Sequence, residues 1–569
     1  MTFSDLSQYF QRIEATPKRL EVTAIFSEML KKLSVQDTDL GVYLSLGYLA
    51  PPFRSIQFNV AQKMMLRAIS LAFNKPLVDV INNANNVGDL GIVAQNLSKT
   101  QDSSLTISQV YEKLQEIAEQ SGAGSQERKL TKIASLLNKL DPVSCRFIAR
   151  IVLGTMRLGF SDITVIEALS WFIAGDKSLK AKIEARYRLH PDIGYVAKKI
   201  KEGGVKGLSK ITLEVGVPVL VAKCARAATA EEVMDKMRGF AYAEDKYDGT
   251  RVQIHLDDGK KVWTFTRNLE ESTHMFPDLV EAILENVKAE TAILDAEAIG
   301  YDKKTGEFIP FQQTIKRKRK HDVAQHALDI PLTLRVFDIL YLNGESLIDK
   351  SLNERWGILQ SVLAKSERIQ LANRANVTNA NQLLEIFEDA VSRGLEGVVI
   401  KNPTAKYAVG NRGFAWIKFK REESGGLEDT IDAVVLGYYF GTGKRTSFGI
   451  GAFLIGLYDP KTDTYKTLSK IGTGLTDEEW VGLKNKCDKV KLQKPLSDVA
   501  IPDVLKCDVY CNLSIVVVVR ADNITISPTH TAGYALRFPR LIAYRADKSA
   551  KDTTTIAEIA NMYKLQKKK

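Results

Sequence analysis

The chain has 569 residues, a hydrophobic content of 45% and a formal net charge of +11. This length predicts three or four domains, and this hydrophobic content is sufficient for ordinary buried cores. The basic balance suits a polyanionic partner. No run approaches 18 apolar residues, and residues 1–18 contain no apolar core of the signal-peptide type. We therefore expect an intracellular protein that is not embedded in a membrane.

The cysteines are few and scattered along the chain. There are five of them, at Cys145, Cys224, Cys487, Cys507 and Cys511. No C-x-x-C pair occurs, and structural zinc sites usually use such pairs. The sequence therefore predicts neither a zinc module nor a disulfide framework, as expected in a reducing compartment.

Residues 1–210 are predicted to be almost entirely helical. Apolar residues recur at helical spacing at Ile133, Leu136, Leu137 and Leu140. Asp141 and Pro142 then open the next helix, because proline is tolerated in a first helical turn. The sequence of residues 88–94 is similar to that of residues 191–197, which suggests two related halves in one helical domain.

A basic stripe runs along one predicted helix in this region. Arg146, Arg150 and Arg157 are spaced by four and seven residues, so they share one helix face. Such a face is either a solvated surface or a surface for nucleic-acid phosphates, and the spacing by itself does not decide between them.

The composition changes near residues 207–217, where glycine, proline and β-branched residues replace the helical pattern. Residues 244–251 then place Lys246 between acids, with Gly249 and Arg251 after it. Residues 251–266 alternate on both sides of Asp258-Gly259, which predicts a β-hairpin. Lys246 is therefore expected on a loop at the mouth of a hairpin, where backbone can approach a ligand.

Three further segments carry charged residues on strand-like patterns. Residues 293–297 form an apolar run with two acids, Asp295 and Glu297. Buried acids are rare unless they are paired or bind a metal. Residues 395–401 begin with Leu395-Glu396-Gly397, and residues 416–420 alternate so that Lys418 and Lys420 share one strand face.

These segments occur in the order seen in the covalent nucleotidyltransferases, and most closely resemble ATP-dependent DNA ligases of the archaeal and eukaryotic type. Lys246 to Gly249 match the K-x-D-G signature of the lysine that becomes attached to a nucleoside monophosphate. The other matching segments are residues 295–297, 336–341, 395–401, 416–420, 537–541 and 545–548. Residues 43–51, 125–129 and 153–159 resemble the helical DNA-binding domain of the same ligases.

The resemblance implies a role for each matching residue. Lys246 would be the catalytic nucleophile, Glu244 would accept a hydrogen bond from the purine amino group, and Phe337 would stack on adenine. The other implied nucleotide-binding residues are Arg251, Arg267, Glu297, Lys401, Lys418, Lys420, Arg545 and Lys548. A structural salt bridge is the alternative for Arg251 and Arg267.

The resemblance also implies ATP as the AMP donor and magnesium as the metal. Glu297 and Glu396 would be the metal carboxylates, since magnesium takes few protein carboxylates together with phosphate oxygens and water. Ala296 stands where the family more often has glycine. That difference concerns only the local backbone geometry beside Glu297.

The expected fold is multidomain. It comprises an all-α DNA-binding domain at residues 1–210, an α+β nucleotidyltransferase (adenylation) domain at 211–422 and an all-β OB-fold domain at 423–569. Short strands at residues 431–439, 453–458, 465–470 and 513–520, with a helix near 476–484, fit an OB-fold. Residues 422–429 are expected to form a hinge.

The implied function is the sealing of nicks in duplex DNA during replication, repair and recombination. The expected partner is nicked duplex DNA, with a sliding clamp as a further possible partner, and the expected state is a monomer in the prokaryotic cytoplasm at the nucleoid. The basic run at residues 316–320 is expected to follow DNA phosphates, with nuclear targeting as the alternative. The rival functions are an RNA-capping or RNA-ligating enzyme and a non-catalytic nick-binding protein.

Overall fold

A computed structural model describes residues 1–101, 103–227, 229–301, 308–309, 330–420, 430–441, 448–472, 475–521, 523–537 and 539–568, with backbone only for 566–568. The basic run at 316–320, the expected hinge at 422–429 and Phe538 lie outside the described residues. The chain divides into two compact units, residues 1–420 and residues 421–569, and each is described by itself. Among the described helices, none has the length and apolar character needed to span a membrane.

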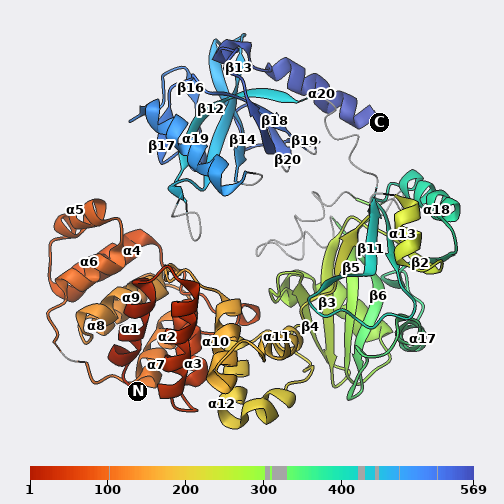
Figure 1. The fold of residues 1–569 in the computed structure, drawn as a ribbon, viewed down its shortest axis with the longest axis horizontal. Coiled ribbons are helices and arrows are strands. Elements are labelled where there is room, and N and C mark those ends of the chain that lie inside the picture. Colours follow the sequence, from red (N-terminus) through yellow and green to blue (C-terminus); the bar gives the residue numbers. More distant parts are fainter. Residues whose placement is uncertain are drawn as a thin grey trace. The chain divides into compact units, whose positions relative to one another are not determined.

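The first part of the chain is helical, as the apolar periodicity predicts (Figure 1). Its helices are α1 Phe3–Glu14, α2 Arg19–Lys32, α3 Thr38–Leu46, α4 Gln62–Phe73, α5 Leu77–Val87, α6 Leu90–Leu97, α7 Ile107–Ala118, α8 Ser125–Leu137, α9 Pro142–Val152, α10 Asp162–Ala174, α11 Lys180–Leu189 and α12 Ile193–Ser209. Asp141 caps α9 by accepting a hydrogen bond from the backbone N–H of Ser144, at 3.1 Å. Pro142 occupies the first turn of α9, as predicted.

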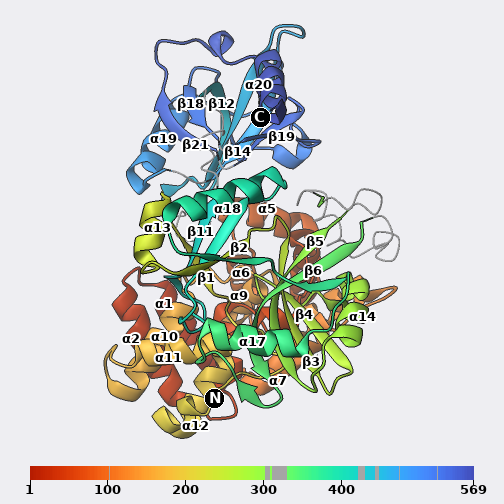
Figure 2. The same cartoon turned by 90° about the vertical axis from the view of Figure 1, so that its right-hand side faces the viewer.

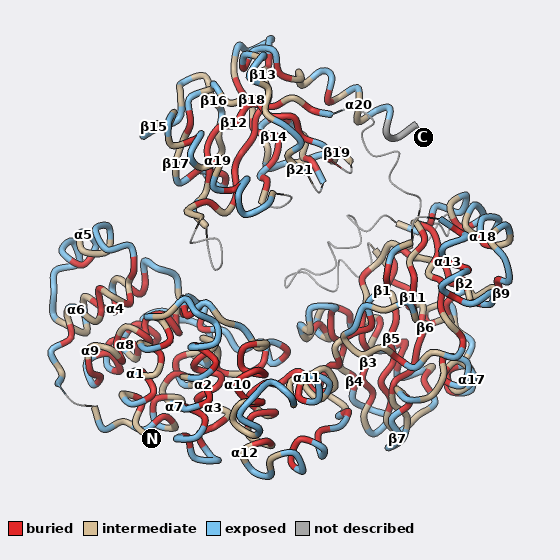
Figure 3. The backbone as a smooth tube through the Cα atoms, viewed as in Figure 1, coloured by how far each residue is buried: buried red, intermediate tan, exposed pale blue. Residues whose placement is uncertain are grey.

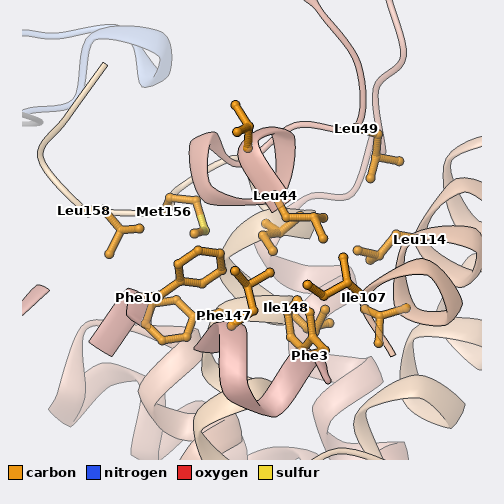
Figure 4. Close-up of a cluster of buried hydrophobic side chains, with 14 of the residues drawn as sticks. Phe3, Phe10, Leu44, Leu49, Ile107, Leu114, Phe147, Ile148, Met156 and Leu158 are labelled. Carbon is orange, nitrogen blue, oxygen red and sulfur yellow. The ribbon is translucent and has the colours of Figure 1, made fainter. Parts of the chain in front are cut away.

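One continuous apolar core joins helices that are distant in sequence. Figure 4 shows Phe3 and Phe10 of α1 beside Phe147 and Ile148 of α9, with Leu44 of α3 above them. The rings of Phe10 and Phe147 meet edge to face, with centroids 5.2 Å apart. Burial of aromatic side chains in this arrangement fixes α9 at the centre of the helical region.

The two similar segments in this region, residues 88–94 and 191–197, each contain the start of a helix. Asp89 caps α6 and Asp192 caps α12, each through its side-chain oxygen. A Cβ on Gly91 would lie 2.6 Å from the Arg146 carbonyl oxygen, and one on Gly194 would overlap the Tyr43 ring. In both copies the aspartate begins the helix and the glycine allows close packing against another helix. The relation between two whole halves stays a prediction.

Two β-sheets follow the helices within residues 1–420. The first has the order β1-β11-β10-β2-β9 and the second the order β4-β3-β5-β6-β7, with β8 paired to β6. The strands are β1 Lys223–Arg226, β2 Ala241–Asp245, β3 Thr250–Asp257, β4 Lys261–Thr266, β5 Ala292–Gly300, β6 Leu332–Leu342, β7 Glu345–Ser346, β8 Ile369–Leu371, β9 Arg374–Val377, β10 Gly397–Lys401 and β11 Arg412–Lys420.

Helices cover one face of each sheet, and the other faces meet. Helices α13 Ala230–Lys236 and α18 Ala380–Ser392 pack on the first sheet, while α14 Pro277–Asn286 and α17 Leu352–Val362 pack on the second (Figures 1 and 2). Between the sheets, Trp416 of the first packs with Ile293 and Leu340 of the second. The strand ends that carry the candidate catalytic residues lie along this junction.

The predicted hairpin is present. Strands β3 and β4 pair antiparallel, with Val252 opposite Thr266 and Asp257 opposite Lys261. Asp258 and Gly259 both have positive φ, of 50° and 58°, as a tight turn matched to the twist of a hairpin requires.

Residues 421–569 form a β-rich unit with an eight-stranded sheet. Its strands are β12 Ile431–Tyr439, β13 Ala452–Asp459, β14 Thr464–Ile471, β15 Lys491–Leu492, β16 Val499–Ala500, β17 Val509–Cys511, β18 Val516–Arg520, β19 Asn523–Ile526, β20 Tyr534–Arg537 and β21 Arg540–Tyr544, and its helices are α19 Asp477–Lys489 and α20 Ile556–Lys568. Figure 3 shows buried residues concentrated along its central strands. The strands and the helix predicted for this part are therefore present.

Candidate active site

Lys246 lies directly after β2, where the backbone still pairs with the first residue of β10 and the residue before it. Its N–H donates to the Gly397 carbonyl oxygen at 2.9 Å, and the Glu396 N–H donates to the Lys246 carbonyl oxygen at 3.2 Å. Its ammonium group forms an ion pair with the Glu396 carboxylate. The two side chains are 23% and 31% exposed, so the amine is fixed in position but open to a ligand.

Two glycines allow the loops of this site to approach one another. A Cβ on Gly249 would lie 2.5 Å from the Ala298 carbonyl oxygen and 2.9 Å from Cγ of Glu297. Gly397 has a φ of +135°, and a Cβ there would lie 2.5 Å from the Phe419 carbonyl oxygen. These contacts are too close for any side chain, which explains why glycine follows both Lys246 and Glu396 in the motifs.

The two predicted metal carboxylates have opposite electrostatic environments. Burial raises the pKa of Glu297 to about 8, and Asp295 and Glu396 add to the rise, while Arg251 and Lys246 oppose it. For Glu396, burial also acts to raise the pKa, but the charge and hydrogen bond of Lys246 lower it overall. Glu297 is therefore a carboxyl group whose charge is poorly compensated, as expected at a position meant for a cation.

The two lysines of β11 stand across from these acids. Lys418 is paired in register with Val399 and Lys420 with Gly397, so both lie beside the Glu396 loop. Burial lowers the pKa of Lys418, and the positive charges of Arg226 and Lys246 lower it further. The resulting concentration of positive charge is suited to a phosphate chain.

Glu244 lies on β2 in a closed ion-pair group. Its side chain is 3% exposed, and one carboxylate oxygen accepts hydrogen bonds from Nε and Nη2 of Arg374, at 3.0 and 2.5 Å. The other oxygen lies 2.5 Å from Nζ of Lys401. Burial lowers the pKa of Lys401, although Glu244 opposes the shift. The sequence motifs indicate Glu244 and Lys401 but give no signal for Arg374.

Phe337 sits at an irregularity of β6. The pairing of β5 with β6 runs from Asp295–Asp338 directly to Ala296–Val336, so Phe337 is an extra residue in its strand. A bulge of this kind redirects a side chain. The ring is partly buried between the sheets, 5.9 Å from the Trp416 ring and 4.6 Å from the Lys401 ammonium. The bulge thus brings Phe337 beside the Glu244–Lys401 pair.

Arg251 is held by an acid on the neighbouring strand. Its Nε and Nη2 donate to the two carboxylate oxygens of Asp295, at 2.9 and 2.6 Å, and Nη1 donates to the Ala222 carbonyl oxygen at 2.8 Å. Asp295 also accepts a hydrogen bond from the Tyr407 hydroxyl at 2.6 Å. This geometry favours the structural alternative for Arg251. Arg267, by contrast, is exposed just after β4.

The two expected nucleotide-binding residues of the β-rich unit are held by local acids. Arg545 donates to both carboxylate oxygens of Asp547, at 2.8 and 2.6 Å. Nζ of Lys548 lies 2.5 Å from the Asp432 carboxylate. They belong to residues 421–569 and are therefore described apart from Lys246 and its neighbours.

Comparison with known proteins covers nearly the whole chain. Residues 2–170 match the model of the DNA ligase N terminus, residues 218–420 that of the ATP dependent DNA ligase domain, and residues 446–548 that of the ATP dependent DNA ligase C terminal region. A probable DNA ligase of Dictyoglomus turgidum is 42% identical, with 100% of this chain and 98% of the relative covered. DNA ligase 2 of Thermofilum pendens is 39% identical with the same coverage.

The chain belongs to the ATP-dependent DNA ligases. Among solved structures, one named Pmar-Lig_Pre. is similar in fold, with a TM-score of 0.56 and 18% identity over 95% of this chain and 99% of that one. The multidomain fold, the ligase activity and ATP as the AMP donor are therefore confirmed. A capping or RNA-joining enzyme and a non-catalytic nick-binding protein are not supported.

The basic stripe of this ligase does not form the open face that the spacing of its arginines predicts. Arg150 is buried, and its guanidinium contacts Glu14 at 2.9 Å and Asp89 at 2.7 Å. Arg157 reaches the same Asp89 but remains 56% exposed, and Arg146 is 11% exposed beside Glu14. The prediction of one open basic helix face is wrong. Acids from α1 and the start of α6 neutralise Arg150, Arg146 is largely buried beside Glu14, and Arg157 lies beyond the end of α9. Sequence spacing cannot reveal such partners from distant helices.

The carboxylates fit magnesium better than a metal held by the protein alone. Within the described ranges, no three His, Cys, Asp or Glu side chains are grouped so that they could hold a metal ion. Magnesium commonly uses one or two carboxylates together with substrate phosphates. Glu297 and Glu396 offer oxygen ligands of that number and kind, and burial raises the pKa of Glu297.

Proposed function

We propose that Lys246 is the nucleophile of this ligase. In the first step, Nζ releases a proton and uses the freed electron pair to bond to the α-phosphorus of ATP. The bond from that phosphorus to the bridging oxygen breaks, pyrophosphate leaves, and the nitrogen releases a second proton to solvent. A 5′-phosphate oxygen at a nick then displaces the lysine and takes the AMP. Finally, the 3′-hydroxyl attacks that 5′-phosphate and AMP leaves. The proposal is supported by the position of Nζ, which is open to solvent and fixed beside a carboxylate.

The adenine site is proposed around Glu244, Phe337 and Lys401. A carboxylate only accepts hydrogen bonds, so Glu244 would favour the amino group of adenine over the carbonyl of guanine. Phe337 offers a ring face beside this pair, as the bulge in β6 supports. Lys401 is buried against Glu244 and would act mainly by balancing its charge.

The phosphate chain of ATP is proposed to lie over Lys418 and Lys420. These lysines would stabilise the charge that develops as pyrophosphate leaves. Arg267, Arg545 and Lys548 stay predictions as nucleotide or phosphate contacts. For Arg251 we favour a supporting role, because Asp295 and the Ala222 carbonyl already occupy its donors.

Glu297 and Glu396 are proposed to hold magnesium. When bound, the ion would neutralise part of the triphosphate charge. The poorly compensated charge of Glu297 supports this assignment. Nicked duplex DNA is the proposed substrate of the helical domain at residues 1–210, the adenylation domain at 211–422 and the OB-fold domain at 423–569 together.

The cellular setting is proposed from the bacterial and archaeal relatives. We propose that the ligase acts in the cytoplasm, at the nucleoid, in replication, repair and recombination. A monomeric state and a sliding-clamp partner stay predictions.

A nick-sealing assay tests the proposed function. A duplex with one labelled nick is incubated with the protein, magnesium and either ATP or NAD⁺, and the products are separated on a denaturing gel. Joined strands with ATP but not with NAD⁺ are expected, together with release of AMP. Joining that needs NAD⁺, or no joining in the presence of ATP and magnesium, would overturn the proposal.

A further inference from the structure

Arg374, on β9, forms an ion pair with Glu244 that the sequence motifs do not indicate. It pairs in strand register with Glu244, and it is the main partner of one oxygen of that carboxylate. Lys401 on β10 holds the other oxygen from the opposite side. Glu244 therefore carries one negative charge between two cations, with all three side chains at most 8% exposed.

The Arg374 guanidinium is also held by aromatic rings. Its central carbon lies 3.6 Å from the Trp356 ring centroid and 4.5 Å from that of Tyr242. Cation–π contacts of this kind favour a fixed plane for the guanidinium. The Tyr242 hydroxyl donates in turn to Asn353 at 2.9 Å. The orientation of the Arg374 guanidinium, which donates to Glu244, is thus set by residues of α17 and β2 as well as by the carboxylate.

One nitrogen of the Arg374 guanidinium, Nη1, is inaccessible to water and lacks a hydrogen-bond partner among the described residues. A buried donor left unpaired costs free energy, and such groups in native proteins call for an explanation. A bound ligand that supplies an acceptor is one such explanation, and the adjacent Glu244 is the residue assigned to the purine.

We infer that Arg374 is the positioning residue that gives Glu244 its selectivity for adenine. The inference rests on the proposed function of this site. With Arg374 and Lys401 on its two oxygens, the carboxylate is held in one orientation, and a carboxylate only accepts hydrogen bonds. Adenine presents a donor at the corresponding position, whereas guanine presents an acceptor. Without Arg374, the carboxylate loses this fixed orientation, so its oxygen is no longer aimed at the amino group of adenine.

The test compares lysine adenylylation with labelled ATP and with labelled GTP. For Arg374→Gln, the ratio of kcat/KM with ATP to that with GTP is expected to fall by about ten- to a hundredfold, the range that one charged hydrogen bond provides. Arg374→Lys keeps the cation but loses the planar guanidinium, so its ATP-to-GTP ratio is expected to fall measurably, by up to about tenfold and by less than in the glutamine variant.

Arg393→Gln is the matched control. Arg393 is an arginine of the same domain that grips the neighbouring acid, Asp245, at 2.8 and 2.9 Å. It is 42% exposed and has no contact with Glu244 in the described part of the chain, so its loss should leave the ATP-to-GTP ratio unchanged.

The outcomes separate this inference from the proposed function. A parental protein that forms no adduct from ATP would overturn the proposed function itself. A parental protein that is labelled, with an Arg374→Gln variant that is slower with both nucleotides but equally selective, would show a structural role and overturn the inference. If the glutamine variant does not fold, Arg374→Lys decides, and an unchanged ratio in a folded lysine variant would also overturn it.

Discussion

At the scale of single residues, the charge of Glu244 is balanced before any nucleotide arrives. Its carboxylate is buried between Arg374 and Lys401, which removes the cost of an unpaired buried charge. The same arrangement leaves the remaining lone pairs of its oxygens for a ligand. The acid can thus serve both the stability of the first sheet and the choice of purine.

We predict that Glu244→Ala weakens the discrimination between ATP and GTP. The loss should be about 1.5–3 kcal/mol, the value of one hydrogen bond to a charged group. Adenylylation rates with the two labelled nucleotides give this number directly, and Asp245→Asn, which alters the acid paired with Arg393, serves as the control. Parental discrimination in Glu244→Ala would mean that adenine is recognised elsewhere.

The identities of these side chains could be read from sequence, but their partners could not. The motif order indicates Lys246, Glu396 and the lysines of β11 because each stands at a fixed place beside a glycine or in an alternating strand. Arg374 carries no such signal, since it lies 130 residues from Glu244 along the chain. For Arg150 the opposite holds, because its spacing in the sequence predicts an exposed side chain, whereas the fold buries it.

At the level of secondary structure, the site depends on glycines, because loops and neighbouring strands approach so closely there that no side chain fits between them. The predicted β3–β4 hairpin follows from alternation and from Asp258-Gly259, which are local signals. The bulge at Phe337 is not local, because it exists only in the pairing of β6 with β5. Long-range pairing therefore sets the parts of the site that the sequence does not predict.

We predict that Gly249→Ala impairs adenylylation far more than folding. The added Cβ would meet the Ala298 carbonyl oxygen and Glu297, so the loop or β5 must move. Overpacking of this kind costs about 1–3 kcal/mol of stability, whereas a displaced catalytic group can cost about a hundredfold in rate. Thermal melting and labelled-ATP kinetics separate the two effects. Gly413→Ala is the control, because a Cβ there meets nothing within 4 Å.

The buried histidine of β3, His255, gives a prediction about how the stability of the protein depends on pH. His255 is fully buried, accepts a hydrogen bond from the Gly216 N–H at 3.1 Å and contacts Gln253 at 2.9 Å. Burial lowers its pKa to about 3, from an ordinary value of 6.5. Between these values the unfolded chain binds more protons than the folded one, so stability falls as the pH drops below about 6.5.

Chemical unfolding of the parent and of His255→Gln at about pH 7 and about pH 5 measures this effect. The parent should lose up to about 1.4 kcal/mol per pH unit more than the variant over this window. The variant starts from a lower stability, because its packing is changed. An equal loss in both proteins would show that His255 does not carry the dependence.

At the scale of the whole molecule, the ligase must hold any nick, whatever its base sequence. The net charge of +11 suits a polyanion such as DNA. We predict that the logarithm of the binding constant for nicked duplex falls linearly with the logarithm of salt concentration, by about 0.9 per phosphate neutralised. Fluorescence anisotropy over a salt series, with two unrelated nick sequences, tests this. A flat response, or a strong preference for one sequence, would contradict it.

Lys246 is proposed to carry the AMP. The direct measurement is incubation with α-labelled ATP and magnesium, denaturing electrophoresis, and mapping of the labelled peptide. Lys246→Arg keeps the positive charge but has no accessible neutral amine, so it should form no labelled adduct while still sealing a nick that already carries 5′-AMP. We expect a label on the parental protein that is stable to denaturation and located at Lys246. A label at another residue, or a labelled Lys246→Arg variant at the parental rate, would contradict it.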